Sequence, residues 1–216
     1  MKRILLIALS VIVIVIVVVA VTYGPFVYRI TIGLNRYESV PPALPARLND
    51  KAILVFSKTN GYRYDDQIKA ANAALSQLAA KRGWTSYVTE NAAVFNPEQL
   101  KRFRAVVWNS VSGDVLTEDQ RRAFRTWIEQ GGGFVGLHGS AGDQNYAWKW
   151  YVDDLIGAQY FGVTMRPHYQ RATIIVEDPN HPATRGLGST WVRTDEWYSF
   201  AASPRRKGYH ILANIG

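Results

Sequence analysis

The chain has 216 residues, of which 48% are hydrophobic, and a formal net charge of +8. This length and composition are typical of one globular domain with a single membrane segment. The chain contains no cysteine, which excludes disulfides, thiolate metal sites and a cysteine nucleophile.

A long apolar run opens the chain. Residues 4–21 carry no charge, and Ser10 is their only polar interruption. The run is long enough to span a bilayer and longer than the apolar core of most cleaved signal peptides. We therefore expect residues 1–24 to form a single-pass transmembrane anchor, with a cleaved signal segment as the alternative. Lys2 and Arg3 before the run favour a cytoplasmic N-terminus and an extracytoplasmic domain.

Residues 25–50 are predicted to be a juxtamembrane linker. Their first part is rich in aromatic residues, as expected at a membrane interface, and Pro41, Pro42 and Pro45 make a semi-rigid spacer. Half of the net positive charge lies in residues 1–47. A basic collar beside anionic lipid explains this distribution more simply than a nucleic-acid site. The sequence therefore predicts a membrane partner and no nucleic-acid partner.

From Lys51 onwards, strand-like and helix-like segments alternate. Short apolar runs predict strands at residues 52–56, 84–89, 105–108 and 134–137. Helical spacing, helix stops and a capping box predict helices near residues 66–82, from 97 and over 117–130. Such alternation builds a mostly parallel sheet covered on both faces. We therefore predict that residues 51–216 form an α/β three-layer sandwich, preceded by one transmembrane helix.

The run from Gly131 to Ser140 reads as a buried strand that ends in a tight, glycine-flanked turn. In α/β-hydrolases such a turn presents a serine nucleophile, and here it presents His138. The run also contains G-x-G-x-x-G, but it follows a helix and leads into a strand, the reverse of a dinucleotide-binding loop. Parallel sheets bind ligands at the carboxyl ends of their strands. The turn therefore favours a histidine at a functional site.

Four ordered motifs resemble the ThuA-like, or trehalose-utilisation, domains. They are LVFSKTNGYR at residues 54–63, GGGFVGLH at 131–138, HPAT at 181–184 and TDEWY at 194–198. The resemblance covers about residues 51–200. It implies a fold of the class I glutamine amidotransferase-like, flavodoxin-like type without its cysteine chemistry. It also implies a carbohydrate-like small molecule as the partner.

Two features depart from the family pattern. Family members commonly have a histidine where this chain has Tyr64, and a phenol is a poor base at neutral pH. The family domain also usually continues past the point at which this chain stops. Residues 51–216 are therefore expected to be a C-terminally short ThuA-like domain.

The predicted catalytic groups are His138, Glu196 and Asp65. An imidazole titrates near neutral pH, and the two carboxylates would hold hydroxyls or share proton transfer. A carboxylate beside an aromatic plane, as in Glu196 and Trp197, suits a sugar. The predicted substrate-binding residues are Arg63, Tyr64, Asn60, Asp143, His168 and Trp197.

Each candidate also has a purely structural explanation. His138 could be a core histidine, Asp65 could cap the helix that follows it, and Trp197 could pack in the core. Histidines and Glu196 include ligand types for a transition metal, but the sequence has no His-x-x-x-His pair. We predict no cofactor and no metal site, and keep a divalent metal as the minor alternative.

The functional prediction is a membrane-anchored domain that binds or processes a carbohydrate-like small molecule by histidine-based acid–base chemistry. A hydrolase, a lyase and an isomerase all fit. The alternative is a non-catalytic sugar-binding or assembly module. A cysteine-dependent amidotransferase is excluded because the nucleophile is missing.

Overall fold

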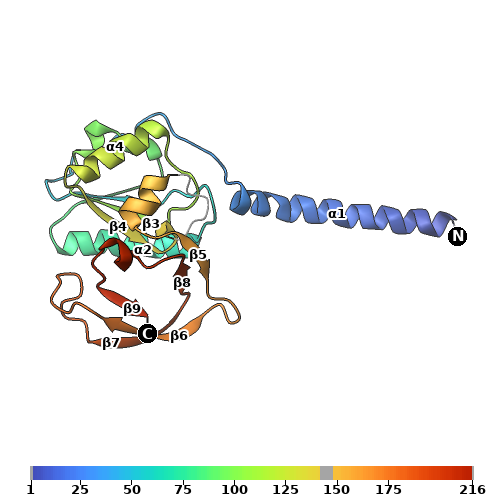
Figure 1. Ribbon diagram of the computed structural model, residues 1–216. Helices are drawn as coiled ribbons and strands as arrows, with labels where there is room; N and C mark the ends of the chain where they lie inside the picture. The colour runs from blue at the N-terminus through green and yellow to red at the C-terminus, as the bar shows by residue number, and fades with distance from the viewer. Residues whose placement is uncertain (1, 142–147, 216) are drawn as a thin grey trace. The chain divides into compact units, whose positions relative to one another are not determined.

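The structure is a computed structural model that describes residues 2–141 and 148–215 (Figure 1). The chain divides into two compact units. We call them unit 1 (Met1–Leu137) and unit 2 (His138–Gly216). The division falls inside the stretch that the sequence predicts as one domain, directly before His138.

Unit 1 begins with the helix α1 (Lys2–Thr31), drawn in blue in Figure 1. The part from Arg3 to Thr31 is long and apolar enough to cross a membrane, with a mean hydropathy of 3.7 in its most apolar window. None of that window is buried by protein. A helix that is apolar on all sides is stable in apolar surroundings, and a membrane provides these for anchors and signal segments.

A four-stranded parallel sheet forms the centre of unit 1. Its strands are β1 (Ile53–Phe56), β2 (Ser86–Thr89), β3 (Ala105–Asn109) and β4 (Gly133–Leu137). They lie in the order β2-β1-β3-β4, and every neighbouring pair is parallel. The prediction of four parallel strands in one sheet before His138 is confirmed.

Helices cover both faces of this sheet (Figure 1). The helices are α2 (Asp65–Lys81), α3 (Pro97–Leu100) and α4 (Glu118–Glu129), with the short 3-10 helix η1 (Ala92–Val94) before α3. Ile53, Val55 and Val107 pack against Ala79 of α2. The alternate strand residues face an aromatic cluster, in which Trp108 stacks on Phe124 of α4. Alternation along each strand thus divides the core of unit 1 into two layers.

Unit 2 contains two small antiparallel sheets among the described residues. One pairs β5 (Tyr160–Val163) with β8 (Tyr198–Phe200), and the other has the order β7-β6-β9. The strands of the second sheet are β6 (Gln170–Val176), β7 (Thr190–Asp195) and β9 (Ala213–Ile215). The remaining elements are η2 (His138–Ala141), the π-helix η3 (Trp150–Ile156) and η4 (Pro204–Lys207).

The loops after β1 and β3 approach each other closely at Gly113. Its φ is +68°, and a Cβ atom there would lie 2.5 Å from the backbone nitrogen of Gly61. We expect Gly113→Ala to lower the free energy of unfolding by about 2 kcal/mol, because the backbone conformation and the crowding both oppose a side chain. Urea unfolding measures this loss.

Gly83 provides the matched control for this substitution. It has a φ of +70°, but a Cβ atom added there would meet nothing within 4 Å. Gly83→Ala should therefore cost only about 1 kcal/mol, from the backbone conformation alone. Equal losses in the two variants would contradict the close approach of the two loops.

Candidate active site

His138 directly follows β4 and opens the turn η2. Its φ is +50°, in the left-handed region that residues with a side chain rarely adopt. Holding such a residue there costs about 1–2 kcal/mol. Backbone outliers of this kind concentrate at functional sites. The glycine-flanked turn expected from the sequence is present, with His138 in its strained position.

Tyr198, from the small sheet β5–β8 of unit 2, adjoins the His138 ring. The hydroxyl oxygen of Tyr198 lies 3.3 Å from His138 Nε2, and the two ring centroids are 5.5 Å apart. Tyr160 makes an edge contact with Tyr198, at 5.2 Å between centroids. Because β5 and β8 pair with each other, the sheet fixes both phenols. The imidazole therefore has a defined hydrogen-bond partner for Nε2.

Burial lowers the pKa of His138 below its ordinary value of 6.5. The carboxylates of Glu196 and Asp195 act in the opposite direction, but burial is the largest effect. The imidazole is therefore neutral near pH 7. A neutral imidazole can accept a proton from a substrate hydroxyl or C–H group, which is the role of a general base.

The lowered pKa of His138 makes stability depend on pH. Because the unfolded chain has the higher histidine pKa, it binds more protons than the folded chain just below pH 6.5. The contribution of His138 to the free energy of unfolding should therefore fall as the pH drops through this window, and recover as the pH rises. We expect a ring titration midpoint below 6.5 for His138 by NMR, and a flatter stability profile for His138→Asn. A midpoint at or above 6.5 would contradict burial as the main cause.

Glu196 and His168 form a second pair in unit 2. Glu196 Oε2 lies 2.7 Å from His168 Nε2, and the Glu196 side chain is only 5% exposed. Trp197 is held next to this pair, since its Nε1 donates to the Gln170 carbonyl at 2.7 Å. The structure thus brings together three predicted site residues, because Glu196 touches His168 and acts electrostatically on His138.

Four other predicted residues belong to unit 1: three lie in the loop between β1 and α2, and Asp65 begins α2. Arg63 pairs with Asp65 at 2.6 Å and with Glu90 at 2.7 Å, and these two carboxylates are 78% and 51% exposed. Asp65 is the first residue of α2, and Tyr64 stands at the N-cap without a side-chain cap. An acidic residue in the first turn stabilises the helix dipole. Asp65 therefore has a structural role that is independent of any ligand.

The other two residues of this loop also have structural contacts. Asn60 is 2% exposed, and its amide nitrogen donates to the Arg36 carbonyl at 3.1 Å and to the Asp114 carbonyl. The Tyr64 ring packs on Tyr62, at 4.5 Å between centroids. Asp143, the remaining predicted site residue, lies outside the described residues.

Sequence reasoning missed Tyr198 and Lys58. Tyr198 is the last residue of the TDEWY motif, so the motif itself contained the signal. Lys58 follows β1 and is buried, and it forms an ion pair with Glu38 of the segment after α1. The other oxygen of Glu38 accepts a hydrogen bond from the Ala92 backbone at 2.9 Å. No sequence pattern indicates a pairing across this distance in the chain.

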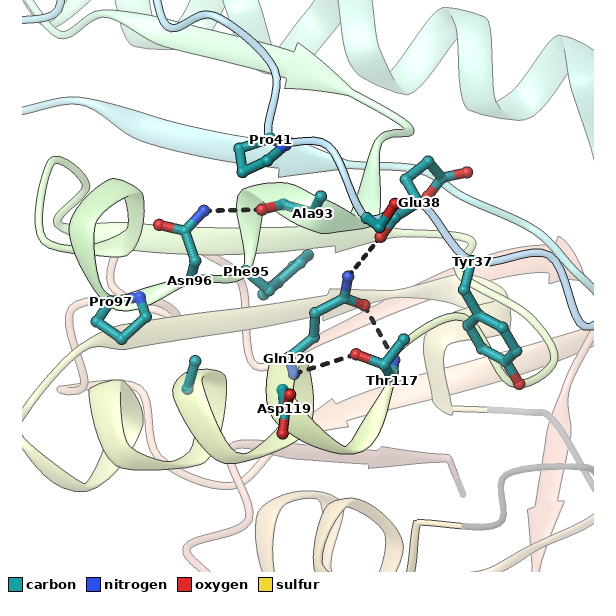
Figure 2. A pocket seen from close by; sticks show the side chains of 12 residues that line it. Tyr37, Glu38, Pro41, Ala93, Phe95, Asn96, Pro97, Thr117, Asp119 and Gln120 are labelled. Atoms are coloured by element: carbon teal, nitrogen blue, oxygen red, sulfur yellow. Dashed lines mark hydrogen bonds between the residues drawn. The ribbon is translucent and has the colours of Figure 1, made fainter.

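A cavity of about 440 Å³ lies beside this segment in unit 1 (Figure 2). Its walls come from the segment after α1, from η1 and the start of α3, and from the first half of α4 with its N-cap Thr117. The polar groups there already serve the fold: Thr117 and Gln120 form a capping box, and Gln120 Nε2 donates to the Glu38 carbonyl at 2.8 Å. The cavity therefore offers few polar groups to a ligand. Across residues 2–141 and 148–215, no three His, Asp or Glu side chains converge as a metal-ligand set.

The parallel four-stranded sheet and the helices on its two faces define an α/β protein. A family model for ThuA, described as trehalose utilisation, matches residues 52–216, and the chain belongs to this family. The crystal structure of a ThuA-like protein from Bacteroides uniformis ATCC 8492 is 26% identical, with a TM-score of 0.67 over 81% of this chain and 71% of that chain. The family prediction is confirmed.

A ThuA-like protein from Parabacteroides merdae ATCC 43184 is more distant. It is 16% identical, with a TM-score of 0.51 over 69% of this chain and 63% of that chain. At this identity the likeness shows the fold alone. No match to a curated protein was found.

Proposed function

We propose that this protein is a membrane-anchored, outward-facing ThuA-like domain that processes a carbohydrate-like small molecule by general acid–base chemistry at His138. The observation that carries the proposal is the half-buried, neutral imidazole, held in a strained turn next to Tyr198 and within the field of Glu196. The family description, trehalose utilisation, supports the substrate class.

The roles of the neighbouring groups follow from their contacts. Tyr198 holds the His138 ring through Nε2, and its hydroxyl can pass a proton to or from that nitrogen. Glu196 stabilises the imidazolium that forms when His138 takes a proton, because its charge favours the protonated ring. His168 keeps the Glu196 carboxylate in place. Trp197 offers an aromatic face. In unit 1, and independently of these contacts, Arg63 and Asp65 are proposed to bind hydroxyl groups.

The sheet and the turn also support the finer fold assignment. A class I glutamine amidotransferase-like, flavodoxin-like three-layer fold has its reactive residue on a sharp turn after a strand, and His138 stands on such a turn. The chain has no cysteine to serve as nucleophile. Proton transfer without a covalent intermediate is therefore the chemistry we assign to this turn.

The test is a screen of disaccharides and oxidised sugars against the full chain in detergent micelles. We expect at least one sugar to raise the melting temperature and to be consumed over time. If a sugar binds but is not consumed, the protein is the non-catalytic sugar-binding module instead. The Tyr64 ring packs on Tyr62 at a position where the family pattern implies a histidine, which favours that second candidate.

Anchoring is tested separately. We expect the protein to stay in the membrane fraction after an alkaline carbonate wash, with its N-terminal residues intact, because the apolar window of α1 has no protein cover. N-terminal sequencing and fractionation measure this. A soluble form that begins just after Ala20 would show that α1 is a cleaved signal segment.

A further inference from the structure

The C-terminal end of α1 is attached directly to the loop between β1 and α2. Arg29 Nε donates to the Gly61 carbonyl at 2.6 Å, and Arg29 Nη2 donates to Thr59 Oγ1 at 2.9 Å. Just after the helix, the Leu34 backbone donates to the Asn60 carbonyl at 2.8 Å. These bonds hold the loop beside the last turn of the helix.

Aromatic rings make a second contact between the helix and the loop. Phe26 of α1 packs edge-on against Tyr62, with 6.0 Å between the ring centroids. Tyr62 is 43% exposed, and Tyr23 and Tyr28 on the same stretch of helix are more than half exposed. Tyrosines with one face in protein and one edge free are enriched where membrane meets water.

The length of α1 predicts the depth of Phe26 in a membrane. A hydrocarbon core about 30 Å thick takes about 20 helical residues, at about 1.5 Å each. Counted from Ile4, the first residue of the uncharged run, this core ends near Tyr23. Phe26 then lies about 4–5 Å further out. Each headgroup layer is only about 5–8 Å thick, so Phe26 and its neighbour Tyr62 fall inside it.

We propose that the loop between β1 and α2 is itself a membrane-binding surface, with Tyr62 in the lipid headgroup layer. The carboxyl edge of the unit 1 sheet then opens at the bilayer surface, and its loops meet ligands that are attached to or concentrated at lipid. This inference rests on the proposed anchoring of α1. It adds a second point of membrane contact, made by the folded part of the chain.

The absence of native cysteine allows a clean test in the full chain. Three single-cysteine variants are labelled with a water-sensitive fluorophore and reconstituted in liposomes: Tyr62→Cys, Val13→Cys and Leu78→Cys. Val13 lies midway along the apolar run. Leu78 is 58% exposed and lies about 20 Å along α2 from Asp65, so it is the matched control on the same unit.

The expected result is that lipids with a headgroup nitroxide quench most of the fluorescence at Tyr62→Cys and leave Leu78→Cys unaffected. Label on Val13→Cys should be quenched only by nitroxides deep in the acyl chains. If the label on Val13→Cys lies in hydrocarbon and the label on Tyr62→Cys lies in water, the proposed loop contact is wrong while the anchor stands. If Val13→Cys reports water, the anchor and the loop contact both fail.

Discussion

Replacing His138 by alanine is expected to reduce turnover by about 10²–10⁴-fold, the usual contribution of a general acid or base. The loss should appear in kcat, since the imidazole acts on the reacting proton. The fold should survive, because alanine meets the same left-handed backbone at φ +50° and adds no bulk. The measurement is steady-state turnover of a sugar identified in the screen, together with the melting temperature.

His210 supplies the control for this substitution. It also lies in unit 2, is 64% exposed, pairs with Asp178 and packs edge-on against His181. We expect His210→Ala to keep its turnover. Tyr64→His, which introduces the histidine that the family pattern implies at this position, should keep or increase turnover. Undiminished kcat in His138→Ala with an unchanged melting temperature would show that His138 is not the general acid or base.

Replacing Glu38 by glutamine is expected to lower the free energy of unfolding by about 3 kcal/mol. The Lys58 side chain is only 6% exposed, so the ammonium loses its counter-charge without gaining water. We place the cost at the lower end for buried pairs because Glu38 is 34% exposed. For a chain of this size the melting temperature should fall by roughly 6–12 °C.

Two further variants test this explanation. Glu98→Gln removes an 80% exposed carboxylate from its pair with Lys101 and should cost less than about 0.5 kcal/mol. Adding Lys58→Met to Glu38→Gln removes the buried ammonium that Glu38→Gln leaves unpaired, so the double variant should recover part of the lost stability. Equal losses in Glu38→Gln and Glu98→Gln would mean that Lys58 is hydrated in solution.

The sheet of unit 1 could be predicted because its signals are local. Residues 52–56 and 105–108 are continuous apolar runs, as expected for strands buried on both faces. The capping box at Thr117 fixed the start of α4, and both of its hydrogen bonds are present. Each of these features depends on residues only a few positions apart.

The contacts of the segment after α1 could not be predicted, because they join residues far apart in the chain. Prolines and polar residues in this stretch indicated a spacer, but Gln120 and Asn60 bind its backbone at Glu38 and Arg36. In unit 2, the residues of β6 alternate between half-buried and exposed, but its last three residues are all apolar, so the sequence itself does not show this alternation. Tyr198 was overlooked for the related reason that its partner, His138, is 60 residues away.

The hydrogen bonds of Arg29 make the last turns of α1 part of the folded domain. A foreign membrane helix could replace residues up to about position 25, because Arg29, Arg36 and Glu38 would then all remain to bind the loop after β1. A fusion that joined a new anchor at residue 48 would remove Arg29, Arg36 and Glu38, which bind the loops after β1. Gene fusions between anchors and domains of this kind should therefore have their junctions inside the helix. The proline-rich stretch, although it resembles a linker, is a poor place to exchange modules.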